Sequence, residues 1–314
     1  MVILSHYAEW WSWFYTLEGT PELIRDGISR FGPYGVAIFL LFSGYGMAKS
    51  AGSKRIGIRF IVKRVTGVYI PYLITVLLIE YLSDGLQTAQ DFIDVLYGHD
   101  FWYMTVLFLF YIAFILIWLA FANTHIRAML MTLFTYTLNH QLSLMEKQDF
   151  WYISNLAFAI GVLAALYEPV INKVVDKAGI ILCVIFGISS IFVVRTALFI
   201  EYVWETPADE IQSRIYAVLL FTLFIFFLAA TWKWYDIILR FLGNLTLYLY
   251  LLHTFLFMWA INYFTYEMST NFIIAAILTL VAAILLYLID CGITALVKYL
   301  YGKWGTKHET KIME

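Results

Sequence analysis

The sequence predicts an all-α fold, a polytopic membrane helix bundle of about ten transmembrane helices with both termini in the cytoplasm. Hydrophobic residues make up 62% of the 314 residues and charged residues only 13%, whereas soluble proteins carry about 25% charged residues. Tyr, Phe and Trp account for 19%, which is typical of proteins with aromatic belts at both membrane interfaces. This composition excludes a soluble enzyme and indicates an integral membrane protein.

Ten apolar stretches follow one another along the chain, and we interpret each as a helix. About 20 helical residues cross about 30 Å of hydrocarbon, and strands are excluded because lipid would leave their edges without hydrogen bonds. The first stretch is too short for a full crossing. The predicted spans are residues 2–16, 34–49, 60–80, 101–121, 126–144, 150–167, 179–200, 214–231, 245–264 and 271–297. We expect one transmembrane domain over residues 1–304 and a short polar tail at 305–314.

Positively charged residues gather on alternate connections, which predicts the orientation of the helices. If the chain starts in the cytoplasm, most of the 20 Lys and Arg residues lie on inner segments, as the positive-inside rule requires. One inner segment holds six of them: Lys49, Lys54, Arg55, Arg59, Lys63 and Arg64. Outer connections are acidic instead, and the loop after the third predicted span carries Asp84, Asp91, Asp94 and Asp100.

Five short motifs occur in a fixed order along these spans. They are Phe39-Leu40-Leu41-Phe42-Ser43-Gly44-Tyr45, then Phe60-Ile61-Val62-Lys63-Arg64 with Tyr69-Ile70-Pro71-Tyr72, then Phe101-Trp102-Tyr103, then Trp151 with Phe158-Ala159-Ile160-Gly161, and last Leu242-Gly243-Asn244-Leu245-Thr246-Leu247-Tyr248-Leu249-Tyr250-Leu251-Leu252-His253. Together they resemble the signature segments of the acyltransferase-3 family of integral membrane acyltransferases. The number of spans and the cytoplasmic termini agree with the core of that family.

The resemblance implies an enzyme that transfers acyl groups other than amino-acyl groups. Such proteins move an acyl group, usually acetyl, from cytoplasmic acyl-CoA to a hydroxyl on an extracytoplasmic polysaccharide or lipid-linked sugar. We therefore expect acyl-CoA, with acetyl-CoA preferred, as donor, and a cell-surface glycan as acceptor. The expected location is a bacterial cytoplasmic membrane, surrounded by lipid. The chain shows no zinc-ligand spacing and no nucleic-acid signature, so we expect neither a metal nor a nucleic-acid partner.

His6 is the predicted catalytic residue, because it aligns with the histidine at the end of the family's first helix. A sugar hydroxyl is a poor nucleophile at neutral pH and needs a base, and imidazole has an unperturbed pKa of about 6.5. Glu9 lies three residues further along and can orient the imidazole across the helix face. The alternative is a polar residue near the amino terminus that merely bonds a neighbour.

Donor binding is assigned to Arg59, Lys63, Arg64 and Ser43. Arg and Lys bind phosphates through charge-assisted hydrogen bonds, although basic loops also serve only to set topology and to meet anionic lipid. For Ser43 the competing role is close packing of helices beside Gly44. The chain departs from the family in two places: only five residues precede His6, and Gly67 stands where the second arginine of an Arg-x-x-Arg pair belongs.

Acceptor binding is assigned to Trp102, Tyr103, His140 and His253. Aromatic faces stack on the apolar faces of sugars, but the aromatic pair also suits an interface belt. His253 can instead be a structural histidine, and His140 can belong to a frayed helix end. Two other functions stay open at this point, a surface-polysaccharide exporter and a catalytically inactive homologue, because polar residues within spans suit a transporter as well.

Overall fold

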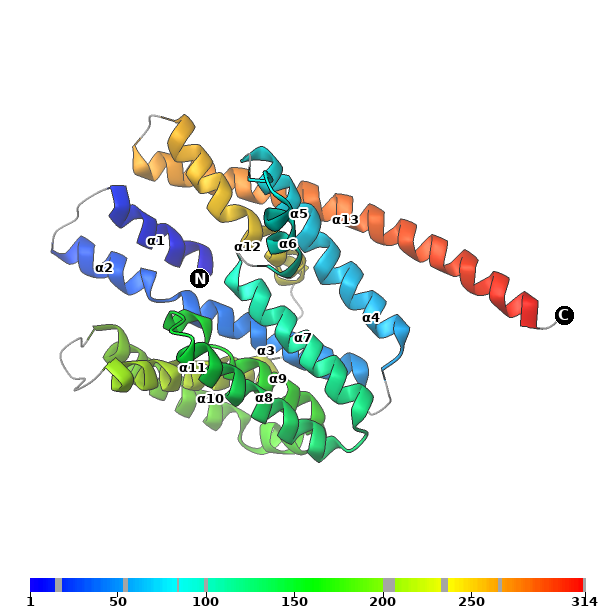
Figure 1. Cartoon of the computed structure of the whole chain (residues 1–314). Helices are drawn as coiled ribbons and strands as arrows, with labels where there is room; N and C mark the ends of the chain where they lie inside the picture. The colour runs from blue at the N-terminus through cyan, green and yellow to red at the C-terminus, as the bar shows by residue number, and fades with distance from the viewer. Residues whose placement is uncertain are drawn as a thin grey trace. The chain divides into compact units, whose positions relative to one another are not determined.

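The computed structural model describes residues 1–14, 19–52, 56–83, 85–98, 101–199, 207–232, 237–264 and 267–312. All regular elements within these ranges are helical (Figure 1), which confirms the prediction of an all-α protein. The helices form two compact units. The first comprises Met1–Phe60 and Tyr97–Trp234, and the second comprises Ile61–Leu96 and Tyr235–Glu314.

Eight helical segments of the described residues are long and apolar enough to cross a membrane. They are Ile24–Ala51, Ile58–Leu82, Trp102–Ala120, Asp149–Leu166, Glu168–Val193, Glu210–Thr231, Phe241–Tyr263 and Ser269–Leu296. Two predicted spans are not among them: α1 (Val2–Phe14) has only 13 residues, and α8 (Thr124–Leu144) has 21 residues but a more polar sequence. The polytopic character is confirmed, whereas the count of ten spans and the cytoplasmic termini stay predictions.

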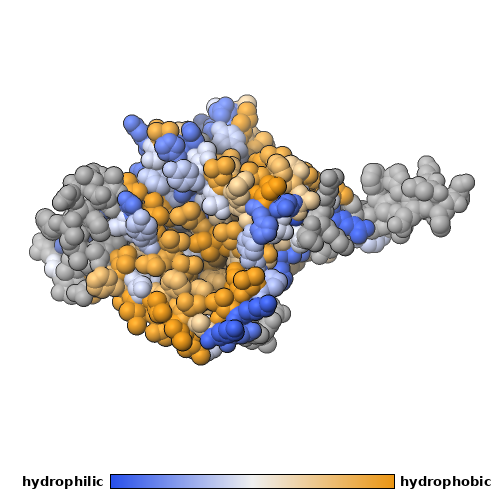
Figure 2. Space-filling model, turned by 90° about the horizontal axis from the view of Figure 1, so that it is seen from below, coloured by the Kyte–Doolittle hydropathy of each residue, from blue (hydrophilic) through white to orange (hydrophobic). Residues whose placement is uncertain are grey.

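Many apolar side chains lie on the surface, as a membrane protein requires. On α10 the side chains of Ile188, Ile191 and Phe192 are each well over half exposed. Figure 2 shows a broad area of hydrophobic residues on the face seen from below, with hydrophilic residues towards its edges. Water would disfavour such a surface, since monomeric soluble proteins rarely expose large contiguous apolar patches.

The first unit is built around α3 and a pair of long helices. Its elements are α1 (Val2–Phe14), α2 (Thr20–Ser29), α3 (Gly32–Ala51), α7 (Trp102–Ala120), α8 (Thr124–Leu144), the short 3-10 helix η2 (Asp149–Trp151), α9 (Leu156–Leu166), α10 (Glu168–Phe199) and α11 (Pro207–Thr231). Helix α3 packs along α9 and also contacts α11 and α1, while α10 packs along α11.

Two motif glycines bring the backbones of α3 and α9 into contact. A Cβ atom added to Gly44 would lie 2.2 Å from the carbonyl oxygen of Phe158, and one added to Gly161 would lie 2.0 Å from that of Leu41. Real Cβ atoms essentially never approach so closely, so no larger residue fits at either position. Small residues of this kind let helices approach in membranes.

The second unit contains the helix that follows the basic segment. Its elements are α4 (Ile58–Arg64), which begins at the end of the first unit, the π-helical turn η1 (Val65–Tyr69), α5 (Ile70–Leu82), α6 (Ala89–Tyr97), α12 (Ile237–Tyr263) and α13 (Met268–Ile312). Helix α12 packs against α13 and α5. The described helix α13 thus continues into the predicted polar tail.

Part of the predicted outer loop is a helix that folds back along α5. The hydroxyl of Tyr72 donates to the carbonyl of Val95 at 2.6 Å, and that of Tyr69 donates to the carbonyl of Leu96 at 2.9 Å. Tyr72 precedes the end of α5 by ten residues, which is about 15 Å of helix. The carboxyl end of α6 therefore lies well back from the carboxyl end of α5. Of the acidic residues predicted there, Asp84 and Asp100 fall outside the described residues.

Candidate functional site

Helix α1, which carries His6, is held against the first turns of α3. The hydroxyl of Ser5 donates to the carbonyl of Ser29. A Cβ atom added to Gly32 would lie 2.9 Å from Ser5 Oγ, and one added to Gly35 would lie 2.7 Å from a methyl carbon of Val2. Glycine at these two positions, one helical turn apart, lets the short helix approach closely.

His6 contacts the ring of Trp10, one turn further along α1. The two ring centroids are 5.4 Å apart and the planes are inclined by 37°. Trp10 is buried, His6 is half-buried, and Glu9 is exposed. The indole therefore covers part of the imidazole, which sequence reasoning did not predict, although the spacing of four residues is the signal that would have found it.

His6 lies beside the outer end of α3 under the predicted orientation. Ser5, its neighbour in sequence, contacts Gly32 at the start of α3, and Lys49 lies near the inner end of the same helix. Seventeen residues separate Gly32 from Lys49, which is about 25 Å of helix. His6 therefore lies close to the amino end of α3 and far from Lys49.

An aromatic group surrounds Trp102 at the amino end of α7. Its ring centroid lies 5.2 Å from that of Phe150 and 6.1 Å from that of Trp151. The ammonium group of Lys147 lies 5.0 Å from the centre of the Trp151 ring. Tyr103 is only 6% exposed, and its ring lies 6.2 Å from that of Phe39. The Trp102 group is thus partly exposed, while Tyr103 packs inside the first unit.

The two other predicted histidines have opposite surroundings. His140 is exposed on α8, next to Asn139, whose side-chain oxygen accepts from the amide of Asn155 at 2.9 Å. His253 on α12 is 1% exposed, and its Nδ1 lies 2.6 Å from the carbonyl oxygen of Tyr250. Because a carbonyl only accepts, Nδ1 donates this hydrogen bond.

The predicted donor-binding cations lie on α4. Arg59 and Lys63 are exposed and Arg64 is half-buried, while Lys54 and Arg55 fall outside the described residues. After Arg64 the helix widens into η1, because Pro71 has no N–H to donate to the carbonyl of Gly67 and the N–H of Ile70 bonds the carbonyl of Val65 instead. Gly67 is exposed, and a Cβ atom added there would meet nothing within 4 Å.

Ser43 takes part in helix packing. Its hydroxyl is hydrogen-bonded to that of Tyr111 on α7 at 2.9 Å, and Gly44 beside it touches the backbone of α9. The motif around these residues therefore joins α3 to two neighbouring helices. This geometry agrees with the packing role that the sequence left open.

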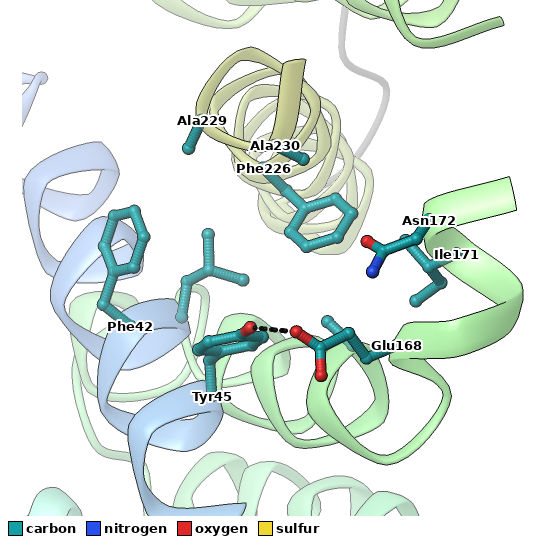
Figure 3. Close-up of a pocket in the computed structure, with 10 residues that line it drawn as sticks. Phe42, Tyr45, Glu168, Ile171, Asn172, Phe226, Ala229 and Ala230 are labelled. Carbon is teal, nitrogen blue, oxygen red and sulfur yellow. Dashed lines mark hydrogen bonds between the residues drawn. The ribbon is translucent and has the colours of Figure 1, made fainter. Parts of the chain in front are cut away.

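A cavity of about 220 Å³ lies towards the carboxyl ends of α3, α9 and α11, beside the amino end of α10 (Figure 3). The hydroxyl of Tyr45 donates to one oxygen of Glu168 at 3.0 Å, and Lys49 donates to the other. The lining residues are Leu41, Phe42, Tyr45, Ala164, Glu168, Ile171, Asn172, Phe226, Ala229 and Ala230. Sequence reasoning missed this site, because its polar contacts join residues that lie far apart in the chain.

Comparison with known proteins identifies the family. The profile of the acyltransferase-3 family, described as an acyltransferase domain, matches residues 1–288. No curated protein and no solved structure gives a significant match to the chain. The matched region includes α1 with His6, the glycine contact between α3 and α9, and α12 with His253. The chain therefore belongs to the acyltransferase-3 family, and the protein is an acyltransferase that spans the membrane several times.

Proposed function

We propose that the protein moves an acyl group, acetyl by preference, from cytoplasmic acyl-CoA to a hydroxyl of an extracytoplasmic polysaccharide or lipid-linked sugar. The observation that carries this proposal is the position of His6: the resemblance assigns it the role of the family's catalytic histidine, and Ser5 and two glycines hold its helix against the start of α3. A bacterial cytoplasmic membrane is the setting in which a cytoplasmic donor and a surface glycan meet across one protein.

The proposed reaction needs one base and one thioester. The imidazole of His6 accepts the proton of the acceptor hydroxyl while the hydroxyl oxygen attacks the thioester carbonyl. The new carbon–oxygen bond forms, the carbon–sulfur bond breaks, and the departing thiolate takes the proton from the imidazolium. A positioned general base of this kind contributes typically about 10²–10⁴-fold. Trp10 shields part of the ring from solvent, and Glu9 lies on the adjacent turn.

Under the predicted orientation, the acceptor is assigned to the outer side of the membrane and the donor to the inner side. The partly exposed rings of Trp102, Phe150 and Trp151 offer a face on which a sugar can stack at the outer side. Arg59, Lys63 and Arg64 follow the inner end of α3 in sequence, where the phosphates of acyl-CoA arrive. Aromatic rings for the sugar on the predicted outer side and cations for the phosphates on the predicted inner side support transfer across the membrane.

The test is replacement of His6 by alanine, with acyl groups on the cell-surface glycan as the measurement. We expect acylation to fall at least 100-fold while the protein still inserts, because the loss of a general base costs about this much. The control is Leu4→Ala, since Leu4 is 54% exposed on the same helix and has no titratable group. Unchanged acylation in an inserted His6→Ala protein refutes the proposal, and loss of the glycan itself supports an exporter.

A further inference from the structure

An ion pair joins the short turn η2 to helix α11. Arg214, near the start of α11, donates a hydrogen bond to the carboxylate of Asp149, the first residue of η2. The two residues are 65 positions apart in the chain, and their side chains are 28% and 20% exposed. Ion pairs that water reaches contribute little to the stability of a fold. The position of this pair therefore says more about its role than its strength does.

The turn η2 carries two of the three rings in the aromatic group at the amino end of α7. Phe150 and Trp151 follow Asp149 directly, and their ring centroids lie 5.2 Å and 6.1 Å from that of Trp102. The turn has only three residues, and hydrogen bonds within 3-10 turns have poor geometry. The position of the two rings therefore depends on side-chain bonds to the neighbouring helices.

Two buried side chains connect the same segment to the start of α3. The amide of Asn155 donates to the carbonyl of Trp151 at 3.1 Å, and the hydroxyl of Ser154 donates to the carbonyl of Pro33 at 2.8 Å. Both side chains belong to residues that are at most 1% exposed. Pro33 lies in the first turn of α3, against which α1 with His6 packs. One turn of α3 thus contacts both the segment with the rings and the helix with the candidate base.

Helix α11 contacts both η2 and this turn of α3. Arg214 and Phe221 are seven residues apart, which is about two helical turns, so they lie on the same side of α11. The ring of Phe221 meets that of Tyr34 edge to face, with the centroids 5.2 Å apart, while Arg214 bonds Asp149. Because Tyr34 belongs to the start of α3, α11 sets the position of η2 relative to that start.

We propose that Arg214 and Asp149 are positioning residues for the acceptor, because their ion pair holds the rings of Phe150 and Trp151 in place relative to the helix of His6. This assignment rests on the proposed function. The pair touches neither the sugar nor the reacting bond. When it is broken, the rings lose their fixed position and stack less well on the acceptor, whereas His6 is held separately by the contacts of α1 with α3. The competing role is a pair that only stabilises the fold.

The experiment measures acetyl transfer by the full-length protein in phospholipid nanodiscs. The probes are labelled acetyl-CoA and deacylated surface polysaccharide from the cells that produce the protein. We expect Asp149→Asn and Arg214→Gln each to raise the KM for the polysaccharide about tenfold, which corresponds to about 1.4 kcal/mol. The kcat and the KM for acetyl-CoA are expected to stay within about twofold. The exchanged pair, Asp149→Arg with Arg214→Asp, is expected to restore the KM to within about threefold.

A matched control and a second measurement complete the experiment. Gln212→Ala removes an exposed hydrogen bond to Tyr216 on the same helix and should leave the KM unchanged. The N–H groups of Trp151 and Tyr152 donate to carbonyls at the start of η2 and just before it, so their hydrogen exchange reports the turn without any need for activity. We expect exchange there to be at least about tenfold faster in both single variants, with the amides of α9 unchanged.

The outcomes separate the positioning role from the proposed function. A raised KM with faster exchange, and recovery of both in the exchanged pair, supports the assignment. If the unmodified protein acetylates the polysaccharide and the single variants keep its KM, the assignment is overturned and the proposed function is not. Single variants that no longer insert also overturn it, because Ser154 and Asn155 should hold the segment without the pair. If the unmodified protein transfers no acetyl group to the polysaccharide, the proposed function fails, and the assignment fails with it.

Discussion

Glycines at two places on α3 make different contacts: one set is important for stability, and the other for the position of the candidate site. From the middle of α3 towards its predicted inner end, Gly44 is in contact with the backbone of α9, and Gly161 of α9 is in contact with the backbone of α3. At the predicted outer end, Gly32 faces the side chain of Ser5, and Gly35 faces the side chain and, less closely, the backbone nitrogen of Val2 on α1. A backbone carbonyl that lies 2.0–2.2 Å from an added Cβ cannot turn aside, whereas the side chains of Ser5 and Val2 can. The inner contact therefore fixes the fold, and the outer one positions His6.

Gly44→Ala is expected to have the largest effect. The added methyl would lie 2.2 Å from a carbonyl oxygen, so α3 and α9 have to separate, at a cost of about 3 kcal/mol or more. The measurement is the melting temperature of the detergent-solubilised protein, together with the amount that inserts. Gly46→Ala is the control, because a Cβ atom there meets nothing within 4 Å and alanine favours the helix by about 1 kcal/mol. Equal stability of the two variants would contradict the inner contact.

Gly35→Ala is expected to reduce activity more than stability. Its added methyl would lie 2.7 Å from a side-chain carbon of Val2 and 3.2 Å from the Val2 nitrogen, so α1 shifts and His6 moves with it. A displacement of about 1 Å in a catalytic group can cost about 10²-fold in rate, and we expect a loss of 10- to 100-fold. The measurement is acyl transfer per inserted molecule, compared with Gly46→Ala. A drop in melting temperature as large as that of Gly44→Ala would show that both ends of α3 act alike.

The fold class could be predicted from the sequence, because apolar stretches of about 20 residues have few alternatives to a membrane helix. The described part of α1 has 13 residues, and the short first span stays a prediction. The return of α6 along α5 was missed, although the sequence contains its signal: Thr88 and Asp91 form a capping box, and Phe92, Val95 and Leu96 have helical spacing. Because its acidic residues favour a loop, the segment was not predicted as a helix.

The candidate site was predicted only in part. His6 could be assigned because the motifs of the chain resemble a family, and its neighbour Trp10 lies close in sequence. The cavity could not be predicted, because Glu168 bonds Tyr45 and Lys49 across more than 115 residues. Its space comes from alanines on two different helices, and alanine in a membrane helix is too common to mark a site. Contacts of this kind depend on the packing of α3 against α9 and α11.

Gly67→Arg sharpens the comparison, because Gly67 is a glycine without a packing role. It is exposed and a Cβ atom added there meets nothing within 4 Å, so we expect a change in stability within about 0.5 kcal/mol. The variant restores the arginine pair of the family with Arg64, and a further phosphate contact is expected to tighten CoA binding about threefold to tenfold, since tenfold is about 1.4 kcal/mol. Gly67→Gln is the control without charge. Equal CoA binding by the two variants would refute a donor role for this position.

The smallest effect concerns α6, whose end is held by side-chain hydrogen bonds instead of glycine contacts. The carboxylate of Asp91 accepts from the N–H groups of Thr88 at 2.6 Å and Gln87 at 3.0 Å. These hydrogen bonds hold the pKa of Asp91 below its usual value, and the bond from Thr88 has the largest effect. Because the folded pKa is the lower one, the stabilisation is complete above the unfolded pKa of about 3.9 and is lost as the pH falls through the folded pKa. We expect the protection of the amides at the start of α6, measured relative to their intrinsic exchange rate at each pH, to fall below about pH 4. In the Asp91→Asn variant, the same amides should already be less protected at pH 7. Equal protection in the variant and the unmodified protein at pH 7 would contradict the cap.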